Sequence, residues 1–185
     1  GTTLMDMLDS FEFDKPYPVL CAKVNNVSQG LKYRAFNSRK VEFLDYTSYI
    51  GRSVYCNSLC FLLCKAAKDV FPGCRVVLRR PISKGYFCSI DKGDGTEMTA
   101  GDLAQIKARM TSLVESDLPF RRHEVLLDEA IELFRSLGYD DKVKLLETSG
   151  DVYVNYYTLG DTPDYYYEAL LSSTGNLKVW SLEMY

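Results

Sequence analysis

The longest helical pattern of apolar residues in this chain runs from residue 51 to residue 71. Its apolar positions recur every three or four residues and so share one helix face: Cys56, Leu59, Cys60, Leu63, Ala67 and Val70. Pro72 and Gly73 end the pattern, because proline cannot continue helical hydrogen bonding and glycine readily takes a turn. We expect the opposite face to point outward, and it carries Asn57, Phe61, Lys65 and Lys68.

The pattern before this helix consists of short elements. A helix is expected over residues 2–11, capped by Thr2 or Thr3, and a buried strand over residues 19–24. Asn25, Asn26 and Gly30 indicate a hairpin, and residues 31–36 and 41–46 add two short strands. Together they predict a small β-grasp-like unit that ends near Ile50 and lacks its first strand.

The pattern after the long helix mixes strands with two further helices. Residues 74–78 and 85–90 read as a strand pair, residues 99–114 as a helix and residues 120–126 as an extended segment. A second helix is expected over residues 129–137, capped by Asp128 and ended by Gly138. Strands are expected at 143–146, 152–158, 165–171 and 177–182. Because strands and helices do not alternate as βαβ units, the predicted class is α+β.

Charge gives no global attraction to nucleic acid, since the 185-residue chain has a net charge of −3 and a pI near 5.3. Local basic groups exist at residues 75–84 and at Arg121 and Arg122. Solvated strand edges explain them more simply than a phosphate-binding track does, and RNA binding stays open. Five of the 14 tyrosines lie between residues 153 and 167, which favours a half-exposed sheet over a base-stacking surface.

The six cysteines lack the close CxxC pairs of zinc ribbons. Cys56, Cys60 and Cys64 recur along one helix, where they act as small hydrophobic residues; a three-thiolate metal site is the alternative. Without a signal peptide or an apolar run of membrane-spanning length, a cytoplasmic protein with no membrane partner is expected.

Motifs for chemistry are scarce. His123 is the one histidine, and its neighbours Arg121 and Arg122 suggest an exposed strand position. The chain carries neither GxxxxGK[ST] nor GxGxxG, so we expect no ATP or dinucleotide site and no cofactor of its own. These residues alone predict an α+β protein with no visible active site.

A series of segments nevertheless follows a known order. After the long helix come Phe71-Pro72-Gly73-Cys74-Arg75, Ser83-Lys84-Gly85-Tyr86, Thr99-Ala100-Gly101-Asp102, Asp117-Leu118-Pro119-Phe120 and Ser173-Thr174-Gly175. In this order residues 51–185 resemble the editing domain of threonyl-tRNA synthetases, which alanyl-tRNA synthetases share. Residues 1–50 resemble the TGS domain that precedes it. The resemblance implies a long helix packed against an antiparallel sheet.

The catalytic residues of that family do not carry over. Its editing site has two histidines four residues apart on the long helix, and these positions are Asn57 and Phe61 here. Its cysteine and third histidine correspond to Tyr166 and Leu170. Phenylalanine and leucine have no lone pair with which to bind a metal or accept a proton. The resemblance therefore implies a degenerate editing site without catalytic residues or metal.

The same pairing of modules is similar to the N-terminal region of bacterial uridine-kinase-like proteins. Segments that look closer to this group are Pro16-Tyr17-Pro18-Val19-Leu20, Ser58-Leu59-Cys60-Phe61 and Ile82-Ser83-Lys84-Gly85-Tyr86. This resemblance implies a kinase domain following in the same polypeptide as the partner. ATP and magnesium are expected only in that domain.

The leading hypothesis is a non-catalytic accessory module with a ligand-binding cleft. Phe61 and Tyr166 would stack on the base of a nucleoside, nucleotide or RNA end, and Lys84 and Tyr86 would line the cleft. The alternatives are a cleft filled by its own aromatic side chains, a scaffold that docks RNA or protein, and an aminoacyl-tRNA deacylase that uses His123.

Overall fold

The computed structural model describes residues 1–12, 15–37, 39–82 and 85–185. These ranges form an α+β fold with five α-helices and antiparallel sheets, as the sequence predicts. In the described part of the chain, no helix combines the length and apolar character needed to cross a membrane.

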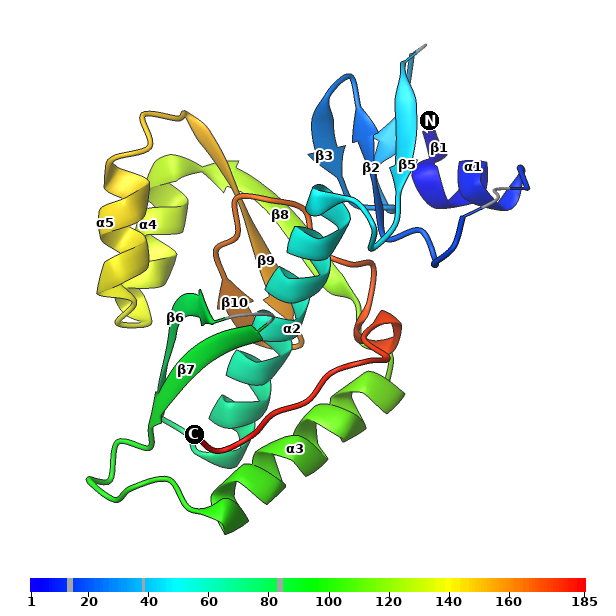
Figure 1. Cartoon of the computed structure of the whole chain (residues 1–185). Helices are drawn as coiled ribbons and strands as arrows, with labels where there is room; N and C mark the ends of the chain where they lie inside the picture. Colours follow the sequence, from blue (N-terminus) through cyan, green and yellow to red (C-terminus); the bar gives the residue numbers. More distant parts are fainter. Residues whose placement is uncertain (13–14, 38, 83–84) are drawn as a thin grey trace.

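The first 48 residues form a small unit of short elements (Figure 1). Its three-stranded sheet has the order β3-β2-β5, and β1 pairs separately with β4. The Thr3 hydroxyl accepts the Asp6 N–H and the Asp6 carboxylate accepts the Thr3 N–H, which caps the predicted helix. The β-grasp assignment of this unit stays a prediction. The elements are β1 (Thr2–Thr3), α1 (Leu4–Asp9), β2 (Cys21–Val24), β3 (Val27–Gln29), β4 (Arg34–Ala35) and β5 (Val41–Leu44).

The long helix α2 (Tyr49–Val70) runs through the middle of the remaining structure (Figure 1). The Ser48 hydroxyl caps it by accepting the Gly51 N–H at 2.9 Å. Helix α3 (Ala100–Glu115) packs beside α2 and begins with the predicted cap at Thr99. Both helices contribute to one core cluster with the sheet behind α2, so α2 is buried on more than one side.

Two antiparallel sheets complete the fold. One pairs β6 (Arg75–Ile82) with β7 (Gly85–Asp91), as predicted. The other has the order β10-β9-β8, which leaves β8 at an edge. Helices α4 and α5 pack together at one end of the second sheet (Figure 1). The remaining elements are β8 (Phe120–Leu126), α4 (Leu127–Ser136), α5 (Asp140–Glu147), β9 (Tyr153–Leu159), β10 (Thr162–Asp164) and the 3-10 turn η1 (Thr174–Asn176).

The predicted outer face of the long helix is wrong at two positions. Phe61 has an exposed fraction of 0% and Lys65 one of 7%. The prediction assumed a helix with one buried face, whereas α2 packs against α3 on one side and residues of the β8–β9 sheet on another. The other two positions, Asn57 and Lys68, are half-buried.

Several predicted elements after residue 126 are also wrong. Residues 143–146 lie in α5, where Val143 and Leu146 turn the same helix face toward α4. Residues 165–171 and 177–182, all of them described, contain no strand. Asp128 does not cap α4; the helix begins after Leu126 without a side-chain cap. Gly138, with a φ of 73°, does end α4 as predicted.

Candidate functional site

The four positions that the resemblance equates with editing residues, Asn57, Phe61, Tyr166 and Leu170, lie on α2 and on the irregular segment after β10. Two of them contact each other directly: the ring centroids of Phe61 and Tyr166 are 5.5 Å apart. The Phe61 ring also lies 5.8 Å from the ring of Phe120 on β8. Leu170 has an exposed fraction of 2% in the same core cluster. We call Phe61, Tyr166 and Leu170 the filled site.

A serine holds the segment of the filled site against α2. The Ser58 hydroxyl accepts the Leu171 N–H at 2.9 Å and donates to the Val54 carbonyl at 2.7 Å. Ser58 is fully buried, so these bonds satisfy a backbone group that has no access to water. The bonds fix Leu170 against α2, although the segment has no strand partner there.

The fourth position, Asn57, is polar and lies beside a carboxylate. Its Nδ2 is 3.5 Å from both Ser53 Oγ and Glu168 Oε2, which makes two weak contacts. The Ser53 hydroxyl donates to the same Glu168 oxygen. The amide of Asn57, the hydroxyl of Ser53 and the carboxylate of Glu168 thus form a small group of polar contacts beside the filled site.

The Tyr166 phenol stays neutral at ordinary pH. Burial raises the pKa of Tyr166 well above its usual value of 10, and the Asp164 carboxylate raises it further. Lys142 pairs with Asp164 at 3.0 Å, and its Nζ lies 5.8 Å from the centroid of the Tyr166 ring. A neutral, packed phenol cannot serve as the thiolate that the editing chemistry places at this position.

The described residues offer no replacement for the missing ligands. Within the ranges given above, no group of three or more His, Cys, Asp or Glu side chains could hold a metal ion. Cys60 and Cys64 are buried, and burial raises the pKa of each thiol to about 12. The filled site itself consists of two aromatic rings and an aliphatic side chain, which pack against one another.

Of the other two predicted ligand-binding residues, Lys84 and Tyr86, the structure describes only Tyr86, since Lys84 lies outside the described residues. Tyr86 is half exposed on β7. It borders a hollow between β7 and the C-terminal residues 181–185, and neither Phe61 nor Tyr166 lines this hollow. Stacking of a base between Phe61 and Tyr166 would require their rings to separate.

The His123 side chain contacts residues of the neighbouring strand β9. Its ring stacks on Tyr156, with centroids 4.9 Å apart and planes at 17°, and its Nε2 lies 3.0 Å from Thr158 Oγ1. The side chain is half-buried, so the predicted exposed position is wrong. His123 also lines the groove described next.

A half-open groove of about 780 Å³ lies between residues 30–33 of the N-terminal unit and the edge strand β8. We call it the β8 groove. Leu170 forms part of its wall, so the groove and the filled site share a segment. The sequence contains one indication of this groove, the Arg121-Arg122 pair, which we interpreted as part of a solvated strand edge. Its polar and aromatic lining includes Lys32, Tyr33, Arg121, Arg122, His123 and Tyr157.

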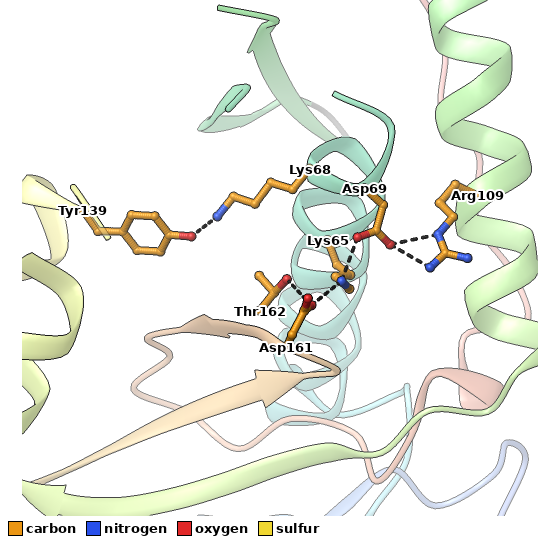
Figure 2. Close-up of polar contacts among 7 residues, drawn as sticks. All are labelled: Lys65, Lys68, Asp69, Arg109, Tyr139, Asp161 and Thr162. Atoms are coloured by element: carbon orange, nitrogen blue, oxygen red, sulfur yellow. Dashed lines mark hydrogen bonds and ion pairs between the residues drawn. The ribbon is translucent and has the colours of Figure 1, made fainter. Parts of the chain in front are cut away.

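A buried lysine joins α2 to its neighbours (Figure 2). Lys65 Nζ lies 2.7 Å from Asp69 Oδ1 and 2.6 Å from Asp161 Oδ1. Asp69 in turn accepts Arg109 of α3 at 2.8 Å. Burial disfavours the Lys65 charge, but the bonds to Asp161 and Asp69 outweigh it and raise the pKa of Lys65. This cluster fastens α2 to α3 and to the turn between β9 and β10.

Comparison with known proteins shows similarity to threonine–tRNA ligases along nearly the whole chain. The enzyme of Desulforamulus reducens is 28% identical over 179 residues, which are 96% of this chain and 28% of that protein. The enzyme of Symbiobacterium thermophilum is 30% identical over 164 residues, 88% of this chain and 25% of that protein. No known family model matches.

The chain therefore spans about a quarter of the length of these relatives. The predicted resemblance to threonyl-tRNA synthetases is confirmed by this similarity. The relatives described above do not bear on the predicted link to nucleoside kinases, which stays a prediction.

Proposed function

We propose that this chain is a non-hydrolytic RNA-binding module related to threonyl-tRNA synthetases. The observation that carries the proposal is the contact between Phe61 and Tyr166, whose ring centroids are 5.5 Å apart. The resemblance places a histidine and a cysteine of the editing site at these two positions. A hydrolytic site must hold a water molecule and a scissile bond within reach of a base. Here the same positions form core packing.

The RNA part of the proposal is supported by similarity. Between 88% and 98% of the chain aligns with proteins whose names specify a tRNA substrate, although it spans about a quarter of their length. A module that has lost catalysis can retain binding, because groups that position the RNA are separate from groups that cleave an ester. The open, partly basic β8 groove is compatible with this role.

The sequence-based hypothesis of a nucleoside-kinase accessory module remains a prediction. It requires a P-loop domain elsewhere in the polypeptide, which would bind ATP and magnesium. It also requires a nucleoside or nucleotide to enter between Phe61 and Tyr166, which are in ring contact. The contact favours the RNA hypothesis, in which the ligand binds elsewhere on the surface.

A direct test measures binding of a fluorescently labelled threonine tRNA transcript to the 185-residue chain by anisotropy, with uridine and ATP tested in parallel by thermal shift. We expect saturable tRNA binding that weakens as salt rises, and no thermal stabilisation by uridine or ATP. Absence of tRNA binding at low salt would overturn the proposal. A clear thermal stabilisation by uridine would favour the nucleoside hypothesis instead.

A further inference from the structure

The β8 groove gathers positive charge from two separate parts of the chain. Lys32 comes from the N-terminal unit, whereas Arg121 and Arg122 come from β8. The carboxylate of Glu124 also lines the groove, on the same face of β8 as Arg122. Arg121 lines the groove from the opposite face of this edge strand, so the lining holds three cations and one carboxylate but only Arg122 and Glu124 share a face. The chain as a whole carries a net charge of −3. The groove therefore reverses the charge of the molecule locally.

The groove cations are not neutralised by acidic partners. Arg122 donates from Nε to Asn155 Oδ1 at 2.8 Å and from Nη1 to Gln29 Oε1 at 2.9 Å. Both acceptors are neutral amides, so they orient the guanidinium without cancelling its charge. Lys32 and Arg121 are exposed, and neither forms a salt bridge within the ranges that the structure describes.

One nearby carboxylate faces Lys32 and is already occupied. Asp117 accepts the Gly175 N–H at 2.9 Å. A hydrogen bond from Ser173 lowers the pKa of Asp117, and Lys178 and Lys32 contribute more weakly. Because Asp117 is held by Ser173 and Gly175, the Lys32 ammonium remains available to a second anion.

The groove also has aromatic walls. Tyr33 lies on the side of the N-terminal unit, and Tyr157 lies beside β8 with an exposed fraction of 6%. The His123 ring is stacked on Tyr156, on the face of the sheet opposite Tyr157, so Tyr33 is the groove ring with room to contact a base. Proteins that bind single-stranded nucleic acid combine a positive groove along the backbone with aromatic side chains near the bases. Three cations would add little to the binding affinity for a peptide unless the peptide were acidic.

We propose that the β8 groove binds the phosphates of a single-stranded RNA segment, with Lys32 and Arg121 as the two mobile contacts and Arg122 as the pre-oriented one. This inference rests on the proposed RNA-binding function and locates the binding site in the β8 groove. RNA is favoured over an acidic peptide because successive phosphates match cations spread over two facing elements, and because aromatic rings line the same groove.

The test compares matched charge deletions inside and outside the groove by anisotropy with a labelled single-stranded RNA 12-mer. The groove variants are Lys32→Ala and Arg121→Ala. The control variants are Lys144→Ala on α5 and Arg75→Ala on β6, which are also exposed and do not line the groove. We expect each groove variant to weaken binding about three- to tenfold and to flatten the salt dependence by about 0.7 per lost phosphate contact.

Two further variants keep the test independent of folding. Arg121→Lys preserves the charge and is expected to retain most of the binding, whereas Arg121→Glu is expected to abolish it. The thermal midpoints of all variants should match that of the wild type, because Lys32 and Arg121 are exposed.

The outcomes separate the two proposals. If the wild type binds neither the 12-mer nor tRNA, the proposed function fails. If the wild type binds RNA but groove and control variants weaken it equally, the groove assignment fails and the function stands. Tighter binding of a polyglutamate peptide than of the 12-mer, with the same dependence on Arg121, would also overturn the assignment by identifying an acidic-peptide site.

Discussion

The filled site and the β8 groove lie on two sides of one segment, yet their interiors differ completely. Leu170 belongs to both: it packs in the core with Phe61 and also borders the groove. At the filled site, aromatic rings meet at 5.5 Å. At the groove, about 780 Å³ remains open and the lining is cationic. The positions that the resemblance equates with a catalytic site form core packing, whereas the neighbouring groove is open and is the place where we propose that RNA binds.

The largest expected effect on stability comes from removing the Phe61 side chain from the filled site. Phe61→Ala removes a fully buried ring that contacts Phe120 and Tyr166, so we expect a loss of about 4 kcal/mol in the free energy of unfolding. Chemical denaturation measures the loss. Tyr49→Ala, which removes a ring with an exposed fraction of 75% on the same helix, should change it by less than about 0.5 kcal/mol.

If Phe61→Ala does not fold, Phe61→Leu gives the same information at a smaller volume change. A solvated, ligand-accessible Phe61 would lose little stability in either variant. That result would show that the site is an open cleft.

A second, smaller effect comes from the bond that joins the shared segment to α2. Ser58→Ala leaves the buried Leu171 N–H without its acceptor, so we expect about 2 kcal/mol of destabilisation. The matched control is Ser116→Ala, because the Ser116 hydroxyl donates to a carbonyl on an exposed helix end, where water can replace it. Similar losses in both variants would mean that the segment is not held by Ser58.

The smallest effect concerns pH and leaves both sites intact. The hydrogen bond from Lys65 lowers the pKa of Asp161 below its usual 3.8. The stabilisation is thus present above pH 3.8 and is lost as pH falls through the lower, folded-state pKa. Asp161 is largely exposed, so Asp161→Asn should cost at most about 1 kcal/mol at neutral pH.

The unfolding free energies of wild type and Asp161→Asn should therefore converge as the pH falls below 3.8. Lys65 keeps its partner Asp69 in this variant, which prevents an unpaired buried charge. A constant difference at every pH would contradict the role of the Lys65–Asp161 pair.

Local signals were sufficient for much of the fold. The Thr99 cap, the Gly138 ending and the β6–β7 strand pair follow from signals within a few residues, and the structure has these elements. Residues 143–146 misled the prediction because a four-residue apolar run fits a strand or a helix, and packing against α4 decided for the helix.

The sites depend on contacts between distant parts of the chain. Phe61 and Lys65 are spaced as an outward-facing stripe. Phe61 is buried because Phe120 and Tyr166 pack against it, and Lys65 is held by Asp161, 96 residues away. The β8 groove joins residues 30–33 to residues 119–124, which no local pattern connects. Sequence could locate the degenerate positions through the family resemblance, but not whether they surround a cleft or fill it.

The central claim is that the editing-type site is filled and does not hydrolyse an ester. The most direct measurement is the single-turnover hydrolysis of mischarged threonine tRNA with the 185-residue chain in excess, compared with the spontaneous rate. We predict that the two rates are equal even when the tRNA is bound. Acceleration by the wild-type chain that is reduced in Asn57→Ala would contradict the account, because it would place a working catalyst beside the filled site, at Asn57 and Glu168.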